Sequence, residues 1–114
     1  MSDIKELPVL AFATAQEFEV WLHNNHGYYD GVWIKMAKKS SGIASIAHDE
    51  ALDVALCYGW IDSLRRGLDD IYFLQKFTPR RAKSQWSERN KQKVAMLIAA
   101  GRMQPSGLAG IERL

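Results

Sequence analysis

The stretch Leu56–Trp86, LCYGWIDSLRRGLDDIYFLQKFTPRRAKSQW, decides the fold. Residues Trp60–Arg66 and Ile71–Thr78 read as strand-forming runs, and a turn sequence that starts at Gly67 separates them. This pattern predicts two antiparallel strands joined by a short loop. Pro79 ends the second strand, because proline has no N–H group to donate to a neighbouring strand.

Outward from this pair, the chain carries helical patterns and one further strand. Apolar residues at helical spacing predict helices over Thr14–Asn25, His48–Tyr58 and Ser87–Gly101, and Pro105 fits the first turn of a fourth helix. Between the first two helices, Val32–Ala37 places every second apolar side chain on one face, as a strand does. The order α-β-α-β-β-α-α indicates an α+β fold.

We therefore predict a single compact domain over residues 1–114, with a small, mainly antiparallel sheet of about three strands packed with three to four helices. A chain of 114 residues has the size of one domain. Its 47% hydrophobic and 25% charged residues are typical of soluble globular proteins. Four Trp, four Tyr and four Phe supply a large surface to bury, which argues against disorder.

The two best-defined helix starts differ in their capping. Thr14 and Glu17 form a T-x-x-E capping box at the start of the first helix. Ala47 occupies the N-cap position of the second helix, and its methyl side chain has no oxygen to accept a hydrogen bond. We expect a threonine at this position to stabilise the domain.

The sequence also bears on location. No apolar run approaches the ~20 residues that span a bilayer, and the start MSDIKELPVL lacks the basic and apolar regions of a secretory signal. Cys57 is the only cysteine, and it lies in a helical apolar pattern where cysteine behaves as a small hydrophobic residue. We therefore expect a reduced, cytoplasmic location.

Charge is distributed unevenly along the chain. Residues 1–59 contain 4 Lys/Arg and 8 Asp/Glu, a net charge of −4. Residues 60–114 contain 11 Lys/Arg and 5 Asp/Glu, a net charge of +6, so the whole chain carries +2. Such asymmetry between halves favours an anionic partner for the second half.

The basic residues of the second half cluster around the predicted hairpin and the segment that follows it: Arg65, Arg66, Lys76, Arg80, Arg81 and Lys83, with Lys91 and Lys93 beyond. Arg65 and Arg66 point to opposite faces of a strand, so only one of them can share a surface with Lys76. Arg80 and Arg81 follow Pro79 in an extended segment, where guanidinium groups can grip a phosphate or carboxylate in bidentate fashion. The alternative is a solvated surface with salt bridges to Asp62, Asp69 or Asp70.

Aromatic residues lie among these charges. Trp60 and Phe77 fit the core, because Trp60 follows a helix-ending glycine and Phe77 alternates with Phe73. Tyr72 and Trp86 suit either packing or the stacking of a planar ligand. The candidate ligand-binding residues are therefore Arg65, Arg66, Tyr72, Lys76, Arg80, Arg81 and Trp86.

No combination of residues in the sequence indicates a particular reaction. Asp62 is the one acid within the GWID block, and we expect it to pair with Arg66 on the same face of its strand, with a general-base role as the alternative. His23 and His26 have a spacing that suits a metal, but they have no Cys or acid beside them and fit a surface pair better. We therefore name no catalytic residue, metal site or cofactor.

Three blocks follow one another along the chain: an EALD-ALC-GWID block at Glu50–Asp62, a D-YLQRFTPRR-S-WS pattern at Asp70–Ser87, and AAGRM-P-GL at Ala99–Leu108. Together they resemble the bacterial YdeI/OmpD-associated (bacteriocin-protection) family. The resemblance covers roughly residues 14–114 and corresponds to the N-terminal portion of the family. The chain departs from the family pattern at Ala47, and it lacks the C-terminal helical segment with which relatives usually continue.

The resemblance implies a part in stress response, through tolerance of cationic antimicrobial peptides and of envelope stress, and it brings no catalytic mechanism. We expect a non-enzymatic binding module whose partner is an anionic small molecule, a lipid head group or an acidic protein surface. A nucleic-acid-binding module is one alternative, and it predicts binding that weakens steeply with salt. A small enzyme that uses Asp62 is the other, and it predicts a pocket around this residue with a raised carboxyl pKa.

Overall fold

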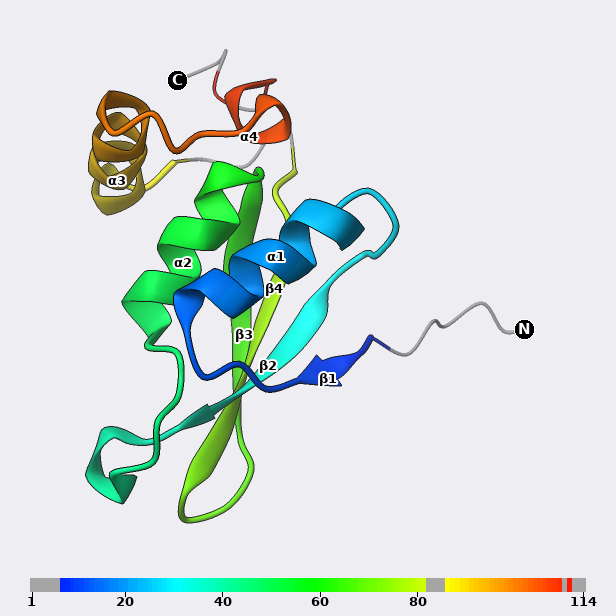
Figure 1. The fold of residues 1–114 in the computed structure, drawn as a ribbon, viewed down its shortest axis with the longest axis vertical. Helices are drawn as coiled ribbons and strands as arrows, with labels where there is room; N and C mark the ends of the chain where they lie inside the picture. Colours follow the sequence, from blue (N-terminus) through cyan, green and yellow to red (C-terminus); the bar gives the residue numbers. More distant parts are fainter. Residues whose placement is uncertain (1–6, 82–85, 110, 112–114) are drawn as a thin grey trace.

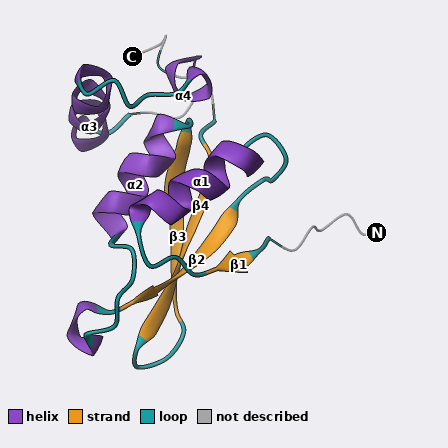
Figure 2. Cartoon of the chain, in the orientation of Figure 1, coloured by secondary structure: helices purple, strands orange, loops and turns teal. Residues whose placement is uncertain are grey.

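The computed structural model describes residues 7–81, 86–109 and 111, and it has the α+β architecture predicted from the sequence. A sheet of four strands, mostly antiparallel, has helices on one face and at one end (Figure 1; Figure 2). The order along the chain is β-α-β-α-β-β-α-α. It differs from the predicted order only by one short strand at the start.

The elements have the following bounds. The strands are β1 (Val9–Leu10), β2 (Val32–Ala37), β3 (Trp60–Gly67) and β4 (Tyr72–Pro79). The helices are α1 (Ala15–Asn25), α2 (His48–Cys57), α3 (Glu88–Ala99) and α4 (Pro105–Ala109), with a short 3₁₀ helix, η1 (Lys39–Ser41), in the loop before α2. The predicted hairpin is confirmed as β3 and β4.

Strand β4 lies at the centre of the sheet, whose order is β1-β2-β4-β3. β4 pairs antiparallel with both β2 and β3, and β1 pairs parallel with β2. The loop before β4 is held by Asp69, whose carboxylate accepts hydrogen bonds of 2.8 Å from the backbone N–H groups of both Ile71 and Tyr72. These two hydrogen bonds hold the pKa of Asp69 below its usual range, and the bond from Tyr72 has the larger effect.

One side of the sheet is buried, and none of the described helices lies on the other side (Figure 1). Helices α1 and α2 lie against the buried side (Figure 1), where alternate residues of β2, such as Ile34, are fully buried. Trp60 and Phe77 also lie in this core, as predicted, and Phe18 of α1 packs against Phe77 with tilted rings whose centroids are 5.6 Å apart. We call the opposite side, which carries Trp33, the open face.

The small helix α4 closes the end of the sheet by packing on the last turn of α2. The backbone N–H of Gln104 donates to the Cys57 carbonyl over 2.9 Å, and Ser106 Oγ donates to the Tyr58 carbonyl over 2.9 Å. Gly107 allows this approach, because a Cβ atom there would lie only 2.2 Å from the Cys57 oxygen. Gly59 adopts φ +81°, the left-handed conformation expected of the glycine that ends a helix.

Candidate functional site

An irregularity in β3 decides which way the hairpin arginines point. Asp62 pairs with Phe77 and Arg65 pairs with Gln75, so two residues of β3 lie opposite the single residue Lys76 of β4. This is a β-bulge, which re-aims side chains and is common near functional sites. The extra residue places Arg65 on the same side as Asp62, facing the helices.

Arg66 consequently lies on the open face. Its guanidinium carbon is 5.2 Å from the centroid of the Trp33 ring, and Lys76 Nζ is 5.7 Å from the same ring. On the same face, Lys35 Nζ of β2 lies 4.2 Å from the centroid of the Tyr72 ring of β4. The prediction that only one of the two adjacent arginines shares a surface with Lys76 is confirmed.

The open face therefore carries three cations and two aromatic rings on three adjacent strands. Lys35 comes from β2, Lys76 from β4 and Arg66 from β3. The strand register assigns no Asp or Glu to this side of β2, β3 or β4. Each cation–π contact contributes about 0.5–1 kcal/mol at an exposed site, so the rings hold the charged groups without neutralising them.

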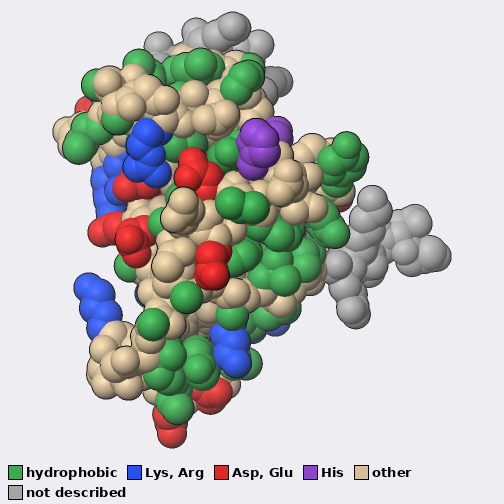
Figure 3. All heavy atoms as spheres, viewed as in Figure 1, with side chains coloured by type: hydrophobic (Ala, Val, Ile, Leu, Met, Phe, Trp, Pro, Cys, Tyr) green, Lys and Arg blue, Asp and Glu red, His purple; other side chains and the backbone are tan. Residues whose placement is uncertain are grey.

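Arg65 faces a cleft of about 740 Å³ on the helix-bearing side of the sheet. The cleft lies between the hairpin and the segment that joins β2 to α2, which projects at the lower left of Figure 1 and borders a hollow in Figure 3. Arg65 stacks on Phe73 with its guanidinium carbon 4.5 Å from the ring centroid, and its Nε donates to Gln75 Oε1 over 3.2 Å.

His48 also lines this cleft, and Asp62 lies behind it. His48 Nε2 and Asp62 Oδ2 are 3.0 Å apart. The hydrogen bond from His48 holds the pKa of Asp62 below its usual range, and partial burial opposes this effect without cancelling it. The expected pairing of Asp62 with Arg66 is wrong, because the bulge turns Arg66 to the other side. The raised carboxyl pKa that an enzyme using Asp62 would need is not found either.

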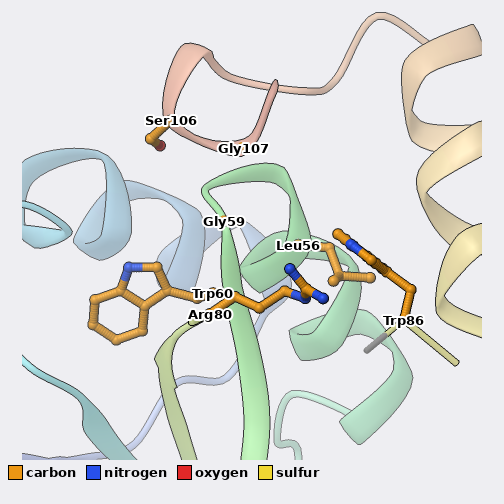
Figure 4. A pocket seen from close by; sticks show the side chains of 7 residues that line it. All are labelled: Leu56, Gly59, Trp60, Arg80, Trp86, Ser106 and Gly107. Carbon is orange, nitrogen blue, oxygen red and sulfur yellow. The ribbon is translucent and has the colours of Figure 1, made fainter. Parts of the chain in front are cut away.

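Arg80 and Trp86 form a third group where β4 ends. The guanidinium carbon of Arg80 lies 3.9 Å from the Trp86 ring centroid, and both residues line a cavity beside Gly59 (Figure 4). Burial lowers the pKa of Arg80. The cavity measures about 90 Å³, well below the 300–1,000 Å³ of typical ligand pockets, so this pair closes the end of the core. Arg81, next to it, is exposed.

The seven candidate residues thus do not form one patch. Arg66, Tyr72 and Lys76 lie together on the open face, Arg65 lies in the cleft, and the Arg80–Trp86 pair lies at the end of β4, with Arg81 beside it. Lys83 falls outside the described residues. The sequence interpretation missed Trp33 and Lys35 on the open face, and His48 and Phe73 in the cleft. The alternation of side chains along Val32–Ala37 places Trp33 and Lys35 on one face of this strand and was the signal that could have identified them.

The alternative interpretation, in which internal salt bridges neutralise the basic residues, applies only to part of the cluster. Among residues 7–81, 86–109 and 111, the ion pairs are His48–Asp62, Arg89–Asp49 and Lys93–Asp53. Lys93 of α3 is therefore matched to α2, and Figure 3 shows acidic and basic side chains side by side in this area. The cations of the open face have no carboxylate of the described residues within 4.0 Å.

The cysteine and the two histidines near the end of α1 are held in packing or hydrogen-bonding contacts within the fold. Cys57 is fully buried, and burial raises the pKa of its thiol to about 11, so it stays protonated at neutral pH. His23 Nδ1 lies 3.3 Å from the Tyr58 hydroxyl, and His26 Nδ1 lies 2.8 Å from the Leu22 carbonyl oxygen. In the described part of the chain, no three His, Cys, Asp or Glu side chains gather as a metal site would require.

The described helices include none with the length and apolar character that crossing a bilayer requires.

Comparison with known proteins gives one match. Residues 10–110 match a protein family described as Domain of unknown function (DUF8412). Neither the curated proteins nor the solved structures contain a match to the chain.

Proposed function

We propose that this chain, which belongs to the family described as Domain of unknown function (DUF8412), is a non-enzymatic module that binds an anionic ligand on its open face. One observation carries the proposal: Lys35, Arg66 and Lys76 lie on neighbouring strands of a sheet surface that no described helix covers, and those strands present no acid on the same side. An excess of positive charge on a solvent-facing surface attracts anions and accelerates their association.

The arrangement favours an extended ligand over a single phosphate. Neighbouring strands are about 4.8 Å apart, so cations on three adjacent strands span roughly 10 Å. A row of carboxylates on an acidic protein segment matches this spacing, whereas one phosphate reaches only one or two of the three. We therefore take an acidic surface of a partner protein as the ligand.

Single-stranded nucleic acid is the second candidate, because Trp33 and Tyr72 lie between the cations, and such rings stack bases in many binding sheets. The contacts argue against base stacking. Arg66 and Lys76 lie over the Trp33 ring, and Lys35 lies over Tyr72. A base would have to displace these cations before it could reach the rings.

The resemblance to YdeI/OmpD-associated proteins supports a more specific role in stress response. A binding module without catalytic residues is consistent with the tolerance of cationic antimicrobial peptides that this resemblance implies. Cells that lack the protein should then be more sensitive to a cationic peptide, and the Lys76→Gln variant should restore tolerance less well than the native chain. Equal survival with and without the protein would contradict this role.

Binding itself can be tested by calorimetry with a glutamate oligomer. Native protein should bind it, and affinity should fall as salt rises. Lys76→Gln and Arg66→Gln should each weaken binding several-fold. Lys91→Gln removes the same charge from the exposed surface of α3 and should leave affinity unchanged. No binding by the native chain, or equal losses in all three variants, would refute the proposal.

The same assay separates the two ligand classes. An oligothymidylate and an abasic strand of equal length carry the same charge, but only the first has bases to stack. Equal, weak binding of both would support recognition of charge alone. A strong preference for oligothymidylate, lost in Trp33→Leu, would replace the acidic partner by single-stranded nucleic acid.

A further inference from the structure

The cleft that holds Arg65 is separate from the open face, since the sheet lies between them. Its volume of about 740 Å³ falls within the range of small-molecule sites, about 300–1,000 Å³. Arg65 and Arg66 are adjacent in β3 and point in opposite directions, Arg65 into the cleft and Arg66 onto the open face. A ligand in the cleft would therefore touch none of the open-face cations.

The cleft walls combine positive charge with apolar surface. Lys39 and Arg65 supply cationic groups, and Ile43 and Phe73 supply apolar surface. Lys38 also lines the cleft, and its Nζ donates to the Asp69 carbonyl over 3.0 Å. Asp49 is the one acid among the lining residues, and its carboxylate is already paired with Arg89 of α3. The unmatched charge in the cleft is therefore positive.

Arg65 is held in place by the protein before any ligand arrives. Its guanidinium stacks on Phe73, and its Nε is bonded to the side chain of Gln75. Gln75 is only 3% exposed, and its Nε2 donates to the Leu64 and Lys76 carbonyls over 3.0 and 3.2 Å, which fixes the direction of its oxygen. An arginine restrained in this way loses less side-chain entropy when it binds an anion.

From this geometry we infer a second binding site, in which the cleft takes a small organic acid with an apolar body, the carboxylate on Arg65 and the body against Ile43 and Phe73. A carboxylate suits Arg65 because it accepts two parallel hydrogen bonds from a guanidinium. The apolar lining contributes the remaining affinity through burial of the hydrocarbon portion.

Octanoate is a suitable probe, because it joins one carboxylate to a flexible apolar chain. In an amide chemical-shift titration, octanoate should saturate and should shift the signals of Ile43, Ile46 and Arg65 more than those of Trp33. Arg65→Gln should weaken binding about tenfold, the effect of losing one charge-assisted contact. Acetate, which has the charge without the body, should bind much more weakly, and so should uncharged octanamide.

Two variants make the result specific to the cleft. Lys76→Gln removes a cation from the open face and should leave octanoate affinity unchanged, so failure of this site and failure of the open-face proposal are distinguishable. Ile43→Asp places a negative charge on an exposed lining residue, 45% accessible, and should weaken binding without disturbing the core. Octanoate that binds Arg65→Gln and Ile43→Asp as well as the native chain, or octanamide that binds as well as octanoate, would overturn the inference.

Discussion

Arg65 Nε donates a hydrogen bond of 3.2 Å to Oε1 of Gln75, the one buried polar side chain among the described residues. The bond joins the bulged strand β3 to the central strand β4, directly opposite one another in the register. The bond therefore links a buried side chain of the sheet to a charged side chain that lines the cleft.

The first prediction concerns this coupling. Gln75→Leu should destabilise the domain by about 1–3 kcal/mol, because the buried Gln75 side chain then no longer donates to the Leu64 and Lys76 carbonyls. Arg65→Gln should cost less than about 1 kcal/mol, since Arg65 is exposed. Urea denaturation measures both values. If the two variants lost equal stability, Gln75 would not be the structural member of the pair.

Most of the fold was predictable because its signals are local. The hairpin is indicated by Gly67, Pro79 and two strand-forming runs, all within the continuous segment 60–79. Strand β1 was missed, because its two residues pair in parallel with β2 across a distance in sequence that no periodicity reveals. Two residues are also too few for an alternating pattern to be recognised.

The candidate site was predicted only in part, and the bulge explains why. With regular alternation Asp62 and Arg66 would share a face, so their pairing was a sound expectation. The extra residue between them places the two side chains on opposite faces. Asp62 therefore pairs with His48, and Arg66 lies over the Trp33 ring. Nothing in the residues Ser63 and Leu64 marks a bulge, since neither is glycine or proline.

The second prediction tests the cap of α2. Ala47 stands at the N-cap with no side-chain hydrogen bond, while Glu50 Oε1 already accepts from the Ala47 N–H over 3.1 Å. Ala47→Thr should complete the capping box and raise stability by about 0.5–1 kcal/mol. Ala47→Val has the same branched shape without the hydroxyl and serves as the control. A melting temperature for the threonine variant that does not exceed that of the valine variant would contradict the assignment.

The third prediction concerns pH. The pKa of Asp62 is below its usual value of 3.8 in the folded protein, because His48 donates to the carboxylate. A depressed carboxyl pKa contributes stability that is present above pH 3.8 and is lost as the pH falls through the lower folded value. Asp62→Asn should therefore be less stable than the native chain at pH 7, by about 0.5–1 kcal/mol for a partly exposed pair.

As the pH falls through the lowered folded pKa of Asp62, the difference between Asp62→Asn and the native chain should shrink, because both then carry a neutral side chain at this position. Denaturation curves at several pH values give the comparison, and Asp70→Asn in the exposed turn controls for a general change in net charge. A stability difference that stays constant as the pH falls from 7 through this pKa would show that the hydrogen bond to His48 does not depend on ionisation of the carboxyl.

The fourth prediction concerns the contact of α4 with α2. A Cβ atom at Gly107 would lie 2.2 Å from the Cys57 carbonyl oxygen and 2.9 Å from that of Leu56. Both neighbours are backbone atoms of a helix end, so neither can rotate away as a side chain would. Gly107→Ala should therefore push α4 outward and cost about 1–3 kcal/mol, the range for overpacked sites.

Gly27→Ala is the matched control, because no atom lies within 4 Å of the added Cβ atom there. It should change stability by no more than about 0.5 kcal/mol. In Gly107→Ala, hydrogen exchange should also quicken at Gln104, whose N–H bonds the Cys57 carbonyl over 2.9 Å in the native fold. Native-like stability together with unchanged protection at Gln104 would mean that α4 does not pack on α2 in solution. Loss of protection without loss of stability would mean that it packs there but contributes little to the fold.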